Sequence, residues 1–135
     1  MSNLNDSKII QISAASLLLS VAEADEILDA KELLIILDIL QDFFSINSDD
    51  AKLIMNKAKL ELKKSTGLFE FGSQINKVFS NDDKLDFINC IFEVAFADGD
   101  LHYLEHHTVK KIANILNIEK EDIILAKTEA KNYLD

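Results

Sequence analysis

The chain of 135 residues contains no proline and only three glycines. Antiparallel sandwiches and barrels need a turn about every eight to twelve residues, and turns depend heavily on these two residue types. An all-β fold is therefore disfavoured. Because proline does not mark helix ends here, the ends are predicted from capping residues and from changes in the apolar period. These signals predict an all-α, single-domain bundle of about seven helices.

The expected helices follow one another with short connections. They run from Asp6 to about Glu23, Asp29 to Phe44, Asn47 to about Ser65, Leu68 to Phe79, Ser80 or Asn81 to Phe96, His102 to Leu116 and Glu119 to Leu134. Asn47 with Asp50 is expected to cap the third helix, and Gly67 to close it in a left-handed conformation. The second helix is apolar nearly all round, which predicts a place in the middle of the bundle.

An internal repeat organises the chain. Val21-Ala22-Glu23-Ala24-Asp25 matches Val94-Ala95-Phe96-Ala97-Asp98, and after a one-residue slip Phe43-Phe44-Ser45-Ile46 matches Ile115-Leu116-Asn117-Ile118. Two three-helix repeats, at about 14–58 and 87–130 and joined by 59–86, most economically bury their apolar faces about a pseudo-two-fold axis. Residues 1–135 are thus expected to form one domain, with the two acidic turns near each other.

Charge and composition limit the possible partners. The formal charge is −10, from 14 basic and 24 acidic residues, and every basic residue is a lysine. This balance argues against a nucleic-acid partner, since phosphate contacts dominate such affinity. The longest uncharged run, Ile9 to Ala22, is too short and too polar to span a bilayer, and Met1 to Asn5 lacks the basic region of a signal peptide. We expect a cytoplasmic monomer or homodimer that binds another protein.

The second repeat carries a family resemblance. The segment IFEVAFADGDL from Ile91 to Leu101, followed by Glu105 and by KKIANILNI from Lys110 to Ile118, resembles the second half of a TerB-like domain. That family includes the tellurite-resistance protein TerB and the domain preceding the J-domain in a membrane-anchored DnaJ-like co-chaperone. Its pattern of an A-D-G turn and a glutamate seven residues after the aspartate occurs twice, with Glu26 in place of the first turn glycine.

The resemblance covers most of the chain and carries expectations about fold and role. It implies an all-helical fold of about seven helices, an intracellular setting and a link to stress or metal-ion resistance. His107 also falls where small stand-alone members of the family tend to have a histidine. The resemblance therefore predicts the fold more sharply than the biochemical activity.

The acidic turns are the main candidate site. Ca²⁺ and Mg²⁺ take several carboxylate oxygens that converge from a turn and the helix after it. The candidate ligands for such a divalent cation, or for Zn²⁺, are Asp98, Asp100, Glu105, Asp25 and Glu32, with Asp29 beside them. In the alternative interpretation, Glu32 and Glu105 only stabilise the positive end of a helix dipole. The turn aspartates then only accept hydrogen bonds from the backbone of their own turns. An EF-hand loop is excluded, because Tyr103 and Val109 stand where glycine and glutamate are needed.

Other chemistry has less support in the sequence. His102 and His106 are four residues apart and form a weaker Zn²⁺ candidate with Asp98 or Asp100. Cys90 lies in an apolar helical segment and is expected to be buried core. No catalytic motif, such as H-E-x-x-H or G-x-S-x-G, is present.

The function expected from the sequence is therefore a non-enzymatic binding or adaptor module. The alternatives are a metal-dependent enzyme that uses the turn carboxylates and a purely structural interaction domain. An exposed apolar groove would favour the adaptor, whereas a pocket holding two or more turn carboxylates would favour metal chemistry.

Overall fold

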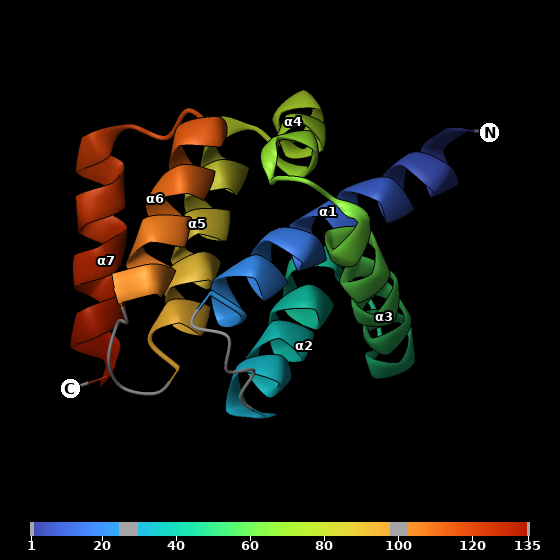
Figure 1. The fold of residues 1–135 in the computed structure, drawn as a ribbon, viewed down its shortest axis with the longest axis horizontal. Helices are drawn as coiled ribbons and strands as arrows, with labels where there is room; N and C mark the ends of the chain where they lie inside the picture. The colour runs from blue at the N-terminus through green and yellow to red at the C-terminus, as the bar shows by residue number, and fades with distance from the viewer. Residues whose placement is uncertain (1, 25–29, 98–102, 135) are drawn as a thin grey trace.

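The structure is a computed structural model that describes residues 2–24, 30–97 and 103–134. Over these ranges the chain forms helices and no strand (Figure 1). The helices are α1 (Ser2–Ala22), α2 (Ala30–Phe44), α3 (Ser48–Lys64), α4 (Phe69–Val78), α5 (Asn81–Ala95), α6 (Tyr103–Ile115) and α7 (Lys120–Leu134). The predicted all-α bundle of about seven helices is confirmed. None of the described helices is long and apolar enough to cross a membrane.

Two helix starts are set by side-chain caps: the predicted cap at Asn47 is confirmed, and of the two alternatives Ser80 and Asn81 it is Ser80 that caps α5. The Asn47 side chain accepts a hydrogen bond of 2.8 Å from the amide of Asp50 at the start of α3. At the start of α5, the Ser80 hydroxyl accepts from the amide of Asp83 (3.1 Å), and the Asp83 carboxylate accepts from the amide of Ser80 (3.2 Å). Each bond pairs an amide that the helix itself leaves without a partner.

The third helix ends at about Ser65 as predicted, but the prediction that Gly67 closes it in a left-handed conformation is wrong. The helix closes at Ser65, whose backbone is extended with φ of −77°, and Gly67 lies outside the left-handed region. The amide of Gly67 instead donates to the Ser65 hydroxyl (3.1 Å). A local side-chain turn of this kind ends the helix without the left-handed residue that a glycine near a helix end usually signals.

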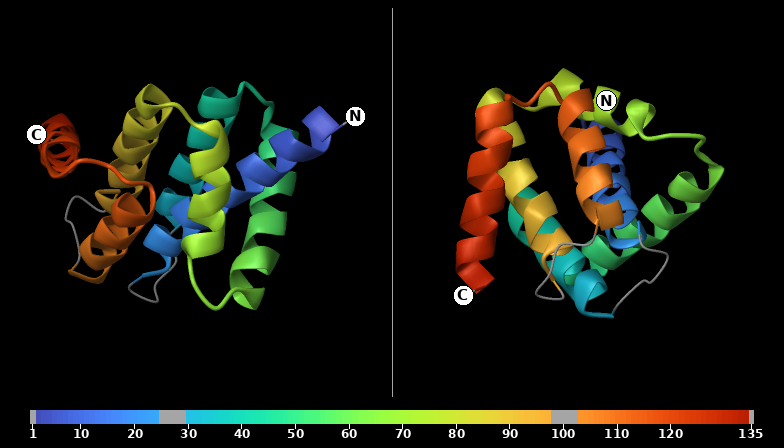
Figure 2. Two further views of the ribbon diagram at one scale, coloured as in Figure 1. Left: turned by 90° about the horizontal axis from the view of Figure 1, so that it is seen from above. Right: turned by 60° about the vertical axis from the view of Figure 1, so that its left-hand side comes forward.

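The central helix is α1, and the prediction that α2 occupies the middle is wrong. α1 contacts α2, α3, α4, α5 and α6 (Figure 2). Every residue from Ser13 to Leu19 is buried. Its small side chains let neighbouring helices approach closely on several sides, and the Ser16 hydroxyl donates to the carbonyl of Ile12 (2.8 Å). α2 lies further out, and its Leu34 is 63% exposed.

A phenylalanine cluster holds α2 against α5. Phe43 stacks on Phe79 at 5.4 Å between ring centroids, and Phe87 meets both rings edge-on at 5.9 and 5.8 Å. Aromatic rings at these separations add attraction beyond the area that they bury. The cluster therefore fixes the separation of α2 and α5 at the end of α2.

The remaining helices are arranged around α5. α5 packs on α1, α2, α6 and α7, and α7 stands beside it at the edge of the bundle (Figures 1 and 2). α1 and α5 end, and α2 and α6 begin, toward the same side of the molecule, at the bottom of Figure 1. The superposition of residues 14–58 on 87–130 stays a prediction.

Candidate functional site

The predicted cation site is described only in part. Four of its acidic residues lie outside the described residues: Asp25, Asp29, Asp98 and Asp100. The other two, Glu32 and Glu105, lie in the first turns of α2 and α6. Each is 1% exposed. An acidic side chain can stabilise the positive end of a helix dipole while it stays in solvent. Burying its carboxylate is costly unless a cation, a proton or hydrogen-bond donors compensate.

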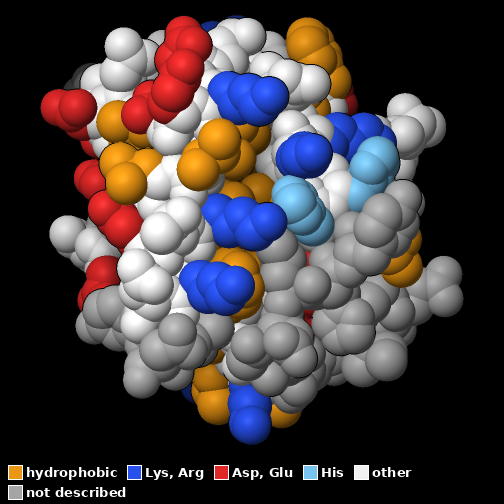
Figure 3. Space-filling model, turned by 90° about the vertical axis from the view of Figure 1, so that its left-hand side faces the viewer, with side chains coloured by type: hydrophobic (Ala, Val, Ile, Leu, Met, Phe, Trp, Pro, Cys, Tyr) orange, Lys and Arg blue, Asp and Glu red, His pale blue; other side chains and the backbone are white. Residues whose placement is uncertain are grey.

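His106 lies near two lysines, Lys110 and Lys127. His106 is partly buried on α6, burial lowers its pKa, and the nearby Lys127 and Lys110 lower it further. Lysine and histidine side chains share this face of the molecule (Figure 3). His102 lies outside the described residues. Within the described ranges, no three His, Cys, Asp or Glu side chains come together as a metal site.

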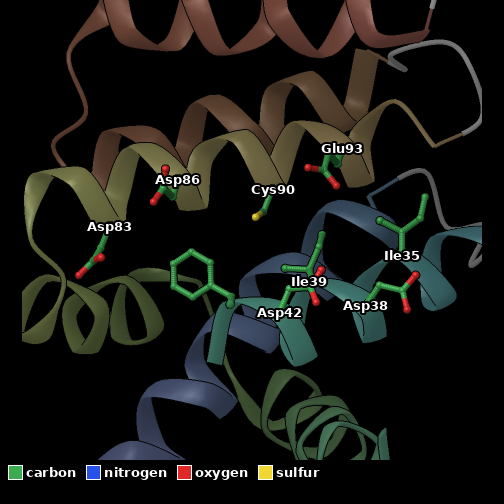
Figure 4. Close-up of a pocket in the computed structure, with 9 residues that line it drawn as sticks. Ile35, Asp38, Ile39, Asp42, Asp83, Asp86, Cys90 and Glu93 are labelled. Carbon is green, nitrogen blue, oxygen red and sulfur yellow. The ribbon is translucent and has the colours of Figure 1, made fainter. Parts of the chain in front are cut away.

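An acidic groove lies between α2 and α5, which sequence reasoning missed (Figure 4). Its volume is about 490 Å³. The lining residues are Ile35, Asp38, Ile39, Asp42, Phe43, Asp83, Asp86, Cys90 and Glu93. The sequence signal was the spacing of Asp38 and Asp42, four residues apart in a helix whose other residues are mostly apolar, which places both carboxylates on one face.

Two carboxylates of the acidic groove, Glu93 and Asp42, interact across it. Burial against the groove raises the pKa of Glu93 on α5, and the negative charge of Asp42 on α2 raises it further. Glu93 is nevertheless an exposed residue, so the burial of its carboxyl is only partial. Negative charge from the two facing helices therefore accumulates in one place.

Cys90 points from α5 into this groove (Figure 4). It is partly buried and packs against the core, so the prediction that it is buried in the core holds only in part. Burial raises the pKa of its thiol to about 12, and Glu93, Asp86 and Asp42 add to the rise. The thiolate that a nucleophile needs is thus disfavoured at neutral pH.

An apolar hollow continues the surface on the other side of α5. Its volume is about 480 Å³, and it is lined by Ile35, Asn89, Glu93, Phe96, Ala97, Ala126, Glu129 and Ala130. Ile35 and Glu93 line both the acidic groove and this apolar hollow. The two concave features therefore adjoin, and together they extend from α2 across α5 to α7.

This architecture defines a helical domain with adjoining concave surfaces and a buried glutamate at the start of each of two helices. The family model described as "Tellurite resistance protein TerB" matches residues 11–128. The chain therefore belongs to the TerB family, and the resemblance seen in the sequence is confirmed. No significant match was found among curated proteins or among solved structures.

Proposed function

We propose that this TerB-family domain is a non-enzymatic adaptor that binds a protein partner in the cytoplasm. The observation that carries the proposal is the apolar hollow between α5 and α7. Covering its partly exposed apolar residues, Ile35, Ala97 and Ala130, would yield about 25 cal/mol for each Å² removed from water. Larger concave apolar surfaces of this kind are typical of ligand and partner sites.

Affinity capture from the native organism tests the adaptor role. Ala130 is partly buried at the edge of the apolar hollow, so Ala130→Glu places a charge there without deleting core volume. The expected result is a specific protein partner that the wild type retains and the Ala130→Glu variant loses. The control is Leu53→Glu, which charges an exposed apolar position on α3.

Two results would contradict the adaptor role. One is loss of the partner in the Leu53→Glu control as well, since this would indicate non-specific apolar adhesion. The other is the absence of any specific partner together with turnover of a small molecule that depends on Asp98. The second result would favour the alternative of a metal-dependent enzyme.

A divalent cation at the acidic turns is the second part of the proposal. Its ligands would come from Asp98, Asp100 and Glu105 in one copy and from Asp25 and Glu32 in the other. The burial of both glutamates supports this part, because a cation offsets the cost of removing carboxylates from water. Carboxylate oxygens suit Ca²⁺, Mg²⁺ or Mn²⁺, and Zn²⁺ accepts them too.

Thermal unfolding with chelator and with each of these ions tests the cation site. An ion at about 100 times its Kd should add about 2.7 kcal/mol to the free energy of unfolding, a shift of about 10 °C in Tm for a chain of this size. Asp98→Asn should abolish the shift, and the exposed Asp49→Asn on α3 should keep it. A wild-type melt that no ion moves at millimolar concentration would contradict the cation site.

Membership of the family supports a link to stress or tellurite-type resistance. The test is growth of a deletion strain on potassium tellurite, complemented with the wild type or with Asp98→Asn. We expect the wild type to restore growth and the variant to restore less. Equal growth of the deletion strain and its parent would contradict the link.

A further inference from the structure

The acidic groove combines two chemistries. Its walls carry five carboxylates, from Asp38 and Asp42 on α2 and from Asp83, Asp86 and Glu93 on α5. Its apolar part is made by Ile35, Ile39, Phe43 and Cys90. None of the nine lining residues is basic. The groove therefore presents an apolar strip between two rows of negative charge (Figure 4).

The arrangement is unfavourable for the chain alone. Like charges four residues apart, such as Asp38 and Asp42, destabilise a helix. The charge of Asp42 also disfavours ionisation of Glu93 across the groove. A cationic partner would relieve both repulsions, so the charge pattern is complementary to a positively charged ligand.

We infer that the acidic groove docks a basic amphipathic helix of a partner protein. The apolar row of that helix would cover the partly exposed Ile35 and Phe43, and lysine or arginine side chains on its flanks would pair with Asp38, Asp42 and Asp86. Helix-in-groove recognition uses this pattern of apolar anchors three and four residues apart. The inference rests on the proposed adaptor role and adds the chemistry of the partner.

The dimensions and the apolar strip favour a helix over a small cation. From Asp83 to Glu93 the groove follows α5 for about 15 Å, which matches about three turns of a partner helix. A polyamine would neutralise the carboxylates but would leave the apolar strip in water. A helix with one apolar row satisfies both parts of the surface at once.

A peptide selection tests the inference without assuming a partner sequence. Random peptides of about 14 residues, or four helical turns, are displayed on phage and selected on the full wild-type chain. Counter-selection uses a groove variant that carries Asp38→Asn, Asp42→Asn and Asp86→Asn, three exposed positions. The enriched peptides are expected to be rich in lysine or arginine, with apolar residues at helical spacing.

Binding of the enriched peptides is then measured by fluorescence anisotropy. The groove variant should bind about tenfold more weakly than the wild type, which corresponds to about 1.4 kcal/mol. A matched control carries Glu61→Gln, Glu70→Gln and Glu121→Gln, which remove the same amount of charge at exposed sites outside the acidic groove. The control should keep wild-type affinity, and amide shifts in NMR spectra should fall on α2 and α5.

Several results would overturn the inference. One is a selection that enriches nothing or enriches peptides without basic residues. Another is an equal loss of peptide affinity in both triple variants. A third is peptide-induced NMR shifts confined to helices other than α2 and α5. Equally strong binding of spermine to the groove would indicate a small-cation site instead. Self-association that only the groove variant loses would identify a second copy of this chain as the occupant.

The two proposals fail in different ways. If capture returns a specific partner that the groove variant still binds and the Ala130→Glu variant loses, the adaptor role stands and docking in the acidic groove is wrong. If capture returns no specific partner with any variant, the adaptor role itself is wrong.

Discussion

Ser45 and Asn117 adopt the same left-handed backbone conformation, with φ of 54° and 59°, at the ends of α2 and α6. In both turns the next amide donates to the carbonyl five residues earlier. The amide of Ile46 donates to the carbonyl of Gln41 (3.2 Å), and the amide of Ile118 donates to that of Ala113 (3.0 Å). This is the Schellman pattern, in which a left-handed residue lets the chain satisfy the last helical carbonyls. The two residues occupy matching positions of the predicted repeat, so α2 and α6 end in the same way.

The first prediction is that Ser45→Gly stabilises the protein. The left-handed region costs a residue with a Cβ about 1–2 kcal/mol, and glycine avoids that cost but loses more backbone entropy. Ser45 is exposed, so little packing is lost, and we expect the free energy of unfolding in urea to rise by about 0.5 kcal/mol. Asn117→Gly should gain less, because asparagine tolerates this conformation.

The control for this prediction is Asn56→Gly, at an exposed position inside α3. Glycine in a regular helix costs about 1 kcal/mol relative to good helix formers, so this variant should be less stable than the wild type. A Ser45→Gly variant that loses as much stability as Asn56→Gly would show that the left-handed turn contributes no strain.

The features that sequence reasoning predicts well are local. The caps at Asn47 and Ser80 are formed by groups within three residues of each other, so short sequence patterns were enough to place the starts of α3 and α5. The family resemblance added the fold, because one turn motif with its glutamate at fixed spacing occurs twice in the chain. These signals need no knowledge of which helices pack together.

The features that sequence reasoning missed depend on contacts between distant segments. The apolar run of α2 suggested a central helix, but the size of the residues decides how closely helices approach, and Ala14 and Ala15 place α1 there. Cys90 was assigned to the core because its neighbours in sequence are apolar, whereas the groove beside it exists only because α5 packs next to α2. Of the candidate ligands at the acidic turns, only Glu32 and Glu105 lie within the described residues. The proximity of the two turns therefore stays a prediction.

The second prediction concerns the close approach of α4 to α6 at Gly72. A Cβ at this position would clash with Cγ2 of Ile115 and lie 3.2 Å from its Cβ. Gly72→Ala should therefore force the two helices apart and lower the free energy of unfolding by about 2 kcal/mol, as overpacking typically does. Thermal or urea unfolding measures the loss.

Gly67→Ala is the matched control for Gly72→Ala. A Cβ there meets nothing within 4 Å, and the backbone lies outside the left-handed region. Replacing glycine where alanine fits reduces the entropy of the unfolded chain, which predicts a gain of about 0.5 kcal/mol. Equal effects of the two substitutions would contradict the close packing of α4 on α6.

The third prediction is that Glu93→Gln stabilises the protein near pH 7. The pKa of Glu93 is raised from its ordinary 4.5 by burial and by Asp42, so the folded state holds its proton more tightly than the unfolded state does. The free energy of unfolding then falls as the pH rises from 4.5 through the raised pKa of the folded state, because over that interval the unfolded state binds fewer protons than the native state. We expect a gain of about 0.3 kcal/mol for this largely solvent-screened charge.

The pH dependence distinguishes this charge effect from a packing effect. The gain from Glu93→Gln should shrink as the pH falls and vanish below 4.5, where the wild-type carboxyl is protonated in both states. Urea unfolding at several pH values measures it, with Glu61→Gln on α3 as a substitution of the same type outside the groove. A gain that stays constant with pH would indicate a cause other than ionisation.

The last prediction is that Cys90 reacts slowly with thiol reagents and that its rate has an unusual pH profile. Its pKa of about 12, against an ordinary 9.0, lowers the thiolate fraction at pH 8 by about a thousandfold relative to the unfolded chain. The labelling rate of a thiol slowed only by restricted access would level off above its ordinary pKa of 9.0. The labelling rate of Cys90 should still rise about tenfold per pH unit there. Stopped-flow labelling of native and denatured protein between pH 7 and about pH 10 separates these outcomes.

The acidic neighbours provide the matching variants for Cys90. Burial is the largest cause of the raised pKa, followed by Glu93, Asp86 and Asp42, so a single neutral substitution should accelerate labelling only in part. Glu93→Gln should have the largest effect of the three, and Asp49→Asn on α3 should have none. Equally fast labelling of native and denatured chains at pH 8 would show that Cys90 does not face the desolvated, negatively charged groove. That result would contradict the packing of α5 on α2.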